Sequence, residues 1–187
     1  MLLPDHLKSL NKEPAELLPW LLNQSSMTEK LQRETTAPVT LAVLSQKWMP
    51  VGIWEKYVLG LSTGTIWQRE ITISAGNTPC WYGRTLISKD TYTTYEAIFS
   101  RLKKETLGDI IFSDARIARI SLKHYQINSH CMEYYWLHPT MRDQNNNTDS
   151  FWLRLSEFRV ESTSAFYLIE ILLPGLLRTI TTLGQNL

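Results

Sequence analysis

Two charged residues stand in segments whose neighbouring side chains are apolar, and these two are the candidates for chemistry. Arg69 lies in the extended segment 67–73, where the alternation of side chains places it on the same face as Ile71 and other apolar residues. Glu170 interrupts the apolar run 165–173. A charged side chain removed from water without a partner costs several kcal/mol. We therefore expect either an ion pair between Arg69 and Glu170 across a sheet, or a pocket in which the two bind a ligand.

Other reactive residue types lack the spacing of a catalytic or metal site. The four histidines have no metal-ligand spacing, and no glycine pattern predicts a phosphate-binding loop. His130 and Cys131 are adjacent, so their side chains diverge on a strand and do not make a Cys–His pair. Cys80 and Cys131 are too few for a disulfide framework, which favours a reducing compartment. We predict no metal site and no disulfide.

Length and charge narrow the class of protein. A chain of 187 residues with a formal net charge of +1 is most simply one domain, residues 1–187, with no electrostatic attraction to nucleic acid or anionic membranes. The start of the chain has no secretory signal pattern. The apolar run 166–177 is shorter than the ~20 residues of a membrane-spanning helix. We therefore expect a soluble cytoplasmic protein, acting as a monomer without nucleic acid or a membrane span.

The elements that must position the two charges can be predicted from periodicity. Residues 67–87 predict a β-hairpin whose loop, 75–79, is slightly longer than the tightest type, with Gln68 and Thr72 on a solvated face. Ser26 and Glu29 have capping-box spacing and predict a short helix with Met27 in its first turn. The remaining predictions are helices over 14–22 and 93–104, and strands over 39–43, 57–61, 116–126, 134–136, 151–160 and 165–173. Together they predict an α+β fold, with a single antiparallel sheet and helices on one side.

Five short motifs resemble the landmarks of the chorismate pyruvate-lyase family. They occur in that family's order and span most of the chain. The sequence departs from the family's pattern in the segment 128–149, which is longer than the family's usual connection. This difference affects what can be predicted for the rim of the pocket. The motifs are LPWLL (18–22) followed by SMT (26–28), WQREI (67–71), GRT (83–85), TLG (106–108) with IF (111–112), and LIEILLP (168–174).

The resemblance implies an enzyme that converts chorismate to 4-hydroxybenzoate and pyruvate without a cofactor, the entry step of ubiquinone biosynthesis. It also implies helical flaps over an internal pocket. The family holds the aromatic acid at positions matching Met27, Arg69, Leu107 and Glu170. Arg69 would bind the ring carboxylate, Glu170 the 4-hydroxyl, and Arg84 the second carboxylate or an exit path. The alternative is a non-catalytic domain of the same fold that binds a small aromatic acid, as in some bacterial repressors.

Overall fold

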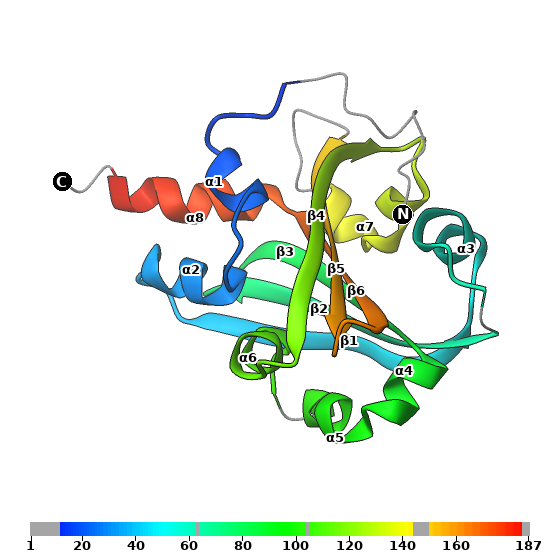
Figure 1. Ribbon diagram of the computed structural model, residues 1–187. Helices are drawn as coiled ribbons and strands as arrows, with labels where there is room; N and C mark the ends of the chain where they lie inside the picture. The colour runs from blue at the N-terminus through cyan, green and yellow to red at the C-terminus, as the bar shows by residue number, and fades with distance from the viewer. Residues whose placement is uncertain (1–11, 63, 104, 144–149, 185–187) are drawn as a thin grey trace.

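The computed structural model describes residues 12–62, 64–103, 105–143 and 150–184. Their centre is a six-stranded antiparallel sheet with the strand order β1-β2-β3-β6-β5-β4, which confirms the α+β class and the single sheet. Figure 1 shows β4 and β5 crossing the view at a steep angle to β1–β3, so the sheet is strongly twisted. The strands are β1 (Val39–Pro50), β2 (Thr65–Ala75), β3 (Thr78–Ser88), β4 (Ile117–Asn128), β5 (Ser150–Val160) and β6 (Ser164–Leu172).

The β2–β3 hairpin is tighter than predicted. Its loop is the two residues Gly76 and Asn77, and Gly76 has a φ of +56°, as a two-residue turn with glycine at its first central position requires. Pro79 belongs to β3, and a register shift beside Ile73 and Ser74 accommodates the extra residue. The prediction of a longer loop over 75–79 was therefore wrong, because the extra residue forms a β-bulge within the paired strands and is not part of the loop.

One face of the sheet is covered by α3 (Ile53–Leu59), the 3₁₀ helix η3 (Met132–Trp136) and α7 (Pro139–Arg142). Trp54 and Val58 of α3 pack into the same hydrophobic cluster as Tyr82 and Leu86 of β3. Two predicted strands were wrong here: 57–61 lies mostly in α3 and 134–136 lies in η3. The spacing of Trp54 and Val58 is helical, and Gly60 ends α3 with a φ of +69°.

The same covering buries the hairpin face that we expected to be solvated. Gln68 and Thr72 are only 3% and 5% exposed. Gln68 accepts hydrogen bonds from Arg84, which also binds Glu55 of α3 at 2.9 Å. The prediction was wrong because Gln68 is satisfied by Arg84 instead of by water, and the Thr72 hydroxyl is buried without a hydrogen-bond partner among the described residues.

The opposite face is covered by the remaining helices. In the hydrophobic clusters on this side, Trp81 and Leu172 pack with residues of α1, α2 and α8, and Ile87 and Phe166 pack with residues of α5, η2 and α6. The predicted helix 93–104 is divided among α4, α5 and η2, and α8 was not predicted. These elements are α1 (Leu18–Leu21), α2 (Met27–Arg33), α4 (Lys89–Thr94), α5 (Glu96–Phe99), η2 (Ser100–Lys103), α6 (Leu107–Ser113) and α8 (Pro174–Gly184).

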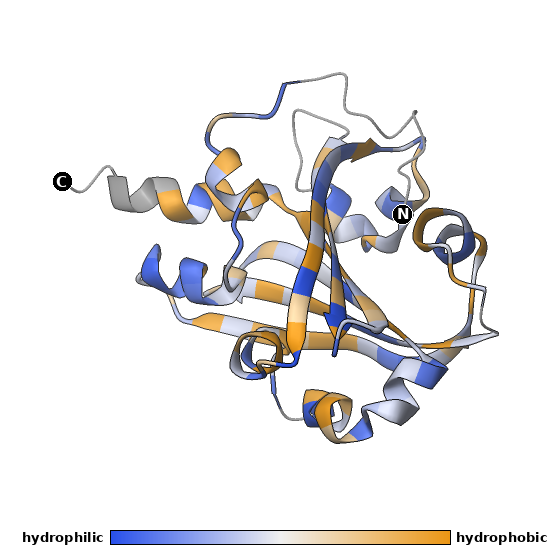
Figure 2. Cartoon of the chain, in the orientation of Figure 1, coloured by the Kyte–Doolittle hydropathy of each residue, from blue (hydrophilic) through white to orange (hydrophobic). Residues whose placement is uncertain are grey.

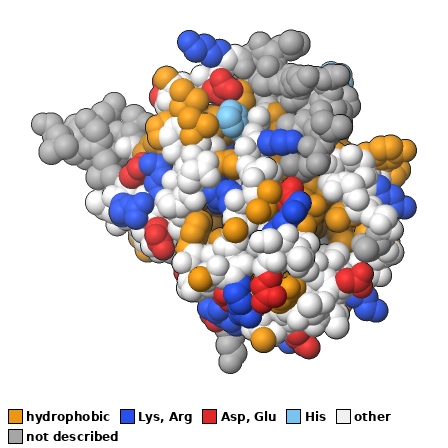
Figure 3. Space-filling model, in the orientation of Figure 1, with side chains coloured by type: hydrophobic (Ala, Val, Ile, Leu, Met, Phe, Trp, Pro, Cys, Tyr) orange, Lys and Arg blue, Asp and Glu red, His pale blue; other side chains and the backbone are white. Residues whose placement is uncertain are grey.

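The distribution of polarity agrees with this arrangement. Figure 2 shows hydrophobic residues recurring along the strands between hydrophilic ones. Figure 3 shows basic and acidic side chains interspersed on the face drawn, without a large area of one sign. Within the described residues, no helix has the length and apolar character needed to cross a membrane.

The junction of α8 with the hairpin predicts a stability effect. A Cβ atom added at Gly175 would lie 2.0 Å from the carbonyl oxygen of Pro79, whereas one added at Gly64 would have no atom within 4 Å. We expect Gly175→Ala to lower the free energy of unfolding by about 1–3 kcal/mol through overpacking, and Gly64→Ala to change it little. Urea unfolding of both variants measures this. Equal stability of the two would contradict the tight contact.

Candidate active site

A pocket lies between the second face of the sheet and the N-terminal ends of α2 and α6. It encloses about 610 Å³ of empty space, including the part open to solvent. Its walls are mostly apolar, and its polar and charged side chains come from β2, β3, β4, β6 and the two helix starts. It is lined by Ser25, Ser26, Met27, Thr28, Leu41, Arg69, Ile71, Ile73, Trp81, Gly83, Thr85, Thr106, Leu107, Gly108, Ile111, Phe112, Arg119, Phe158, Leu168 and Glu170.

The two helix starts are built alike. Ser26 caps α2 by accepting from the backbone N–H of Glu29, as predicted, and Thr106 forms a capping box with Asp109 at the start of α6. Each capping side chain accepts from the backbone N–H of the third residue of its helix. The backbone N–H groups of the first two residues of each helix therefore have no partner within the helix. A Cβ atom at Gly108 would lie 3.3 Å from the Oγ of Ser26, which places the two helix starts against each other.

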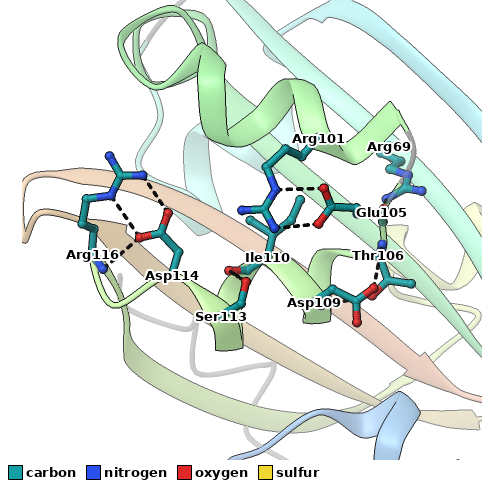
Figure 4. Close-up of polar contacts among 9 residues, drawn as sticks. All are labelled: Arg69, Arg101, Glu105, Thr106, Asp109, Ile110, Ser113, Asp114 and Arg116. Carbon is teal, nitrogen blue, oxygen red and sulfur yellow. Dashed lines mark hydrogen bonds and ion pairs between the residues drawn. The ribbon is translucent and has the colours of Figure 1, made fainter.

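Arg69 is buried in this pocket without a carboxylate partner among the described residues. It is 5% exposed, its Nη1 donates to the backbone oxygen of Glu105 at 3.3 Å, and its Nε has no hydrogen-bond acceptor. Figure 4 shows Arg69 beside Glu105, whose own carboxylate pairs with Arg101. Burial lowers the pKa of the Arg69 guanidinium. An anion in the pocket would satisfy this side chain.

Glu170 is paired, but with Arg154 instead of Arg69. Arg154 lies directly opposite Glu170 on the neighbouring strand β5, and its Nη1 is 3.3 Å from the Oε2 of Glu170. The Arg154 side chain is fully buried and its Nη2 donates to the backbone oxygen of Asn23 at 2.7 Å. The alternative in which Arg69 and Glu170 pair with each other is therefore wrong, because the register pairs Arg69 with Thr85 and Glu170 with Gly83 on β3.

Arg119 is a second pocket arginine, which the sequence did not single out. It lines the pocket from β4, with its guanidinium 4.9 Å from the ring centre of Phe158. Its Nη1 donates to the backbone oxygen of Gln24 at 2.8 Å, and its buried Nε has no acceptor among the described residues. Burial and the neighbouring Arg154 lower the pKa of Arg119, whereas Glu170 opposes the shift.

The structure does not bring Arg84 to this pocket. Arg84 lies on the opposite face of β3, with Glu55 and Gln68, because side chains of consecutive residues point to opposite faces. Its expected role at the second carboxylate is therefore corrected, and its neighbours Gly83 and Thr85 line the pocket instead. The described part of 128–149 also packs on the opposite face and not at the rim, while residues 144–149 lie outside the described residues.

The charges of the site are unbalanced. Arg69, Arg119 and Arg154 face or adjoin the pocket, and Glu170 is the acidic residue among its described lining, so positive charge exceeds negative by two. No cluster of metal-ligating side chains occurs in the described parts of the chain. The pocket is suited to a small aromatic or alicyclic molecule that carries two negative charges.

Comparisons with known proteins identify relatives of the whole arrangement. A family model described as chorismate lyase matches residues 3–169. A probable chorismate pyruvate-lyase of Pseudomonas syringae is 25% identical over 163 residues, covering 86% of this chain and 81% of that protein. One of Aromatoleum aromaticum is 30% identical over 107 residues, 57% of each chain, so that match spans little more than half of the relative.

Solved structures show that the fold also occurs in bacterial regulators. A GntR-family transcriptional regulator from Bacillus cereus aligns with a TM-score of 0.53 at 10% identity, covering 73% of this chain and 92% of that one. PhnF from Mycobacterium smegmatis aligns with a TM-score of 0.54 at 13% identity, covering 82% and 65%. At such identities the likeness concerns the fold alone.

The Arg154–Glu170 pair predicts a large stability effect. Replacing Arg154 with Met leaves the Glu170 carboxylate buried without its cation, which typically costs about 3–5 kcal/mol. We expect urea unfolding to show a loss of this size. Arg33→Met, which removes the exposed pair with Glu29 on α2, is the control and should have little effect. An Arg154→Met protein as stable as the parent would show that the pair does not stabilise the fold.

Proposed function

The chain belongs to the chorismate lyase family, and we propose that it converts chorismate to 4-hydroxybenzoate and pyruvate in the pocket between the sheet and the starts of α2 and α6. The observation that carries this proposal is the buried Arg69 guanidinium, which has no carboxylate partner and shares an apolar pocket with Glu170. Chorismate is a dianion with a ring of suitable size, so it complements both the shape and the charge excess of the site.

Substrate binding would use the two ends of the pocket. Arg69 offers a planar fork that takes the ring carboxylate in a bidentate manner. Glu170 would accept a hydrogen bond from the 4-hydroxyl at the other end. Met27 and Leu107, the first residues of α2 and α6, line the pocket between them, so their unpaired N–H groups and side chains can close over the ring.

The reaction is an elimination that needs no external electrons. The bond between C3 and the ether oxygen breaks, C4 loses its proton, and the ring gains its third double bond. The departing enolpyruvate takes up one proton at its methylene carbon and becomes pyruvate. Because aromatisation makes the reaction strongly favourable, orientation of the substrate and modest proton transfer can supply the catalysis. Glu170, which would lie beside the 4-oxygen, would orient the ring and could accept the C4 proton.

A non-catalytic binding domain is the second candidate, and the fold likeness to regulators favours it. Incubation of the purified chain with chorismate distinguishes the two. Release of pyruvate together with 4-hydroxybenzoate, in equal amounts and above the spontaneous rate, supports the enzyme. Tight binding of chorismate that is recovered unchanged would support the binding domain. We also propose that the chain acts in the cytoplasm as a monomer.

The role of Arg69 predicts a ligand-dependent loss of affinity. Removing a charge-assisted bidentate contact costs roughly 1.5–3 kcal/mol, or ~10- to 150-fold in binding. We expect Arg69→Ala to weaken both chorismate and 4-hydroxybenzoate by this factor, because both carry the ring carboxylate. Phenols without a carboxylate should lose far less affinity. Calorimetric titration of each ligand into the parent and the variant measures this difference. Similar losses for acids and phenols would mean that Arg69 supports the fold and not the ligand.

The role of Glu170 predicts a loss of turnover. Glu170→Gln keeps the size of the side chain but removes the proton acceptor, so we expect kcat to fall by ~10²-fold or more. Glu157→Gln is a matched control, since Glu157 is a buried carboxylate paired with Arg159 near the end of β5. Thermal unfolding on the same preparations separates the two effects. Reduced stability with normal turnover per folded molecule would assign Glu170 a structural role.

A further inference from the structure

We propose that Arg119 binds the second carboxylate of the substrate, the one on the enolpyruvyl group. This inference rests on the proposed function and adds a substrate contact to it. It also distinguishes substrate from product, because 4-hydroxybenzoate lacks that carboxylate. The contact would therefore be lost when pyruvate leaves.

The connectivity of chorismate determines the end of the pocket at which the second carboxylate lies. The enolpyruvyl ether is attached to C3, which neighbours C4, the carbon that carries the hydroxyl. With the ring carboxylate on Arg69 and the 4-oxygen at Glu170, the ether and its carboxylate must lie near Glu170. The cations at that end are Arg154, 3.3 Å from Glu170, and Arg119, which lines the pocket with Glu170 and donates to the same backbone oxygen of Asn23 as Arg154 does.

Of these two cations, Arg119 is the one available to a ligand. Arg154 is fully buried, does not line the pocket, and already contacts Glu170 and the backbone oxygen of Asn23. Arg119 lines the pocket and is half-buried. All three of its hydrogen bonds in the described structure use Nη1, toward the backbone at Asn23 and Gln24 and the Gln24 side chain. The edge of its guanidinium away from Nη1 includes Nε, which has no hydrogen-bond acceptor among the described residues. This edge can take a carboxylate.

Packing and charge both prepare Arg119 for an anion. Its guanidinium lies 4.9 Å from the ring centre of Phe158 and 5.9 Å from that of Phe112, which restricts its orientation. Arg119 and Arg154 repel each other, and Glu170 offsets only part of this repulsion. A second carboxylate placed at Arg119 would offset the remainder, so the substrate relieves an unfavourable interaction that exists in the empty pocket.

The test compares two stable ligands that differ in one carboxylate. 4-Hydroxybenzoate carries the ring carboxylate alone, and 3-(carboxymethoxy)-4-hydroxybenzoate adds a second one through an ether on C3. We expect Arg119→Gln to weaken binding of the second ligand by about 10- to 150-fold while changing that of 4-hydroxybenzoate by no more than about twofold. KM for chorismate should rise in parallel. Arg116→Gln, which alters an exposed arginine paired with Asp114, is the control and should affect neither ligand.

Several outcomes would overturn the proposal. Equal weakening of both ligands would mean that Arg119 only supports the segment at residues 23–24, and unchanged affinity for both ligands would mean that it contacts no carboxylate. If Arg119→Gln fails to fold, Arg119→Lys, which keeps the charge but not the fork, is compared in the same way: a selective loss supports the proposal and a non-selective result contradicts it. Failure of the parent protein to release pyruvate would instead contradict the proposed function, independently of Arg119.

Discussion

The buried pair between Arg154 and Glu170 is the interaction on which the rest of the site depends. Its two partners stand opposite each other on β5 and β6, so the position of the carboxylate is set by strand register and not by a flexible loop. Burying two charges is unfavourable unless additional hydrogen bonds satisfy them. Arg154 meets this requirement only in part: its Nη2 donates to the backbone oxygen of Asn23, at 2.7 Å, in the segment that leads into α2, whereas its Nε and Nη1 have no hydrogen-bond acceptor among the described residues. One guanidinium therefore fixes an acid in the pocket wall and also attaches the covering segment to the sheet.

This attachment couples the pocket to its cover. Arg119 contacts the same segment, through the backbone oxygen of Gln24, and Ser26 and Met27 follow directly. On the other side, Gly108 permits the start of α6 to lie against Ser26, where a larger side chain would have only 3.3 Å to the serine oxygen. A ligand that binds Arg119 would therefore contact a residue that holds the segment leading into α2. The segment at residues 23–24 is held through its backbone carbonyls, so a change of side chain there would leave these hydrogen bonds intact.

The sequence located part of each of the six strands of the sheet because their period is local, although two further predicted strands were wrong. It failed where partners are distant in the chain. The alternation around Arg69 correctly indicated a charged side chain on an apolar face, but the covering of the other face by α3 could not be read from β2 alone. In β4 the alternation placed Arg119 among the polar residues of an outer face. The register shift between Arg119 and Ser121 reverses the alternation and puts Arg119 on the pocket face with Phe158. Likewise, Arg154 stood on a recognisable polar face, but only the register of β5 against β6 identifies Glu170 as its partner.

The likeness to bacterial regulators shows what the fold contributes and what the side chains must add. A twisted antiparallel sheet with helices over one end of its face provides an apolar pocket, whatever the ligand. In this chain the pocket is lined by one acid, Glu170, and two arginines, Arg69 and Arg119, and Arg154 adjoins it. Glu170 is already paired with Arg154, whereas Arg69 and Arg119 have no carboxylate partner among the described residues. A neutral or singly charged ligand would leave one of these arginines without an anion. Under the proposed function, the buried arginines would therefore select for a dianion, and the carboxylate of Glu170 beside them would supply proton transfer in the same pocket.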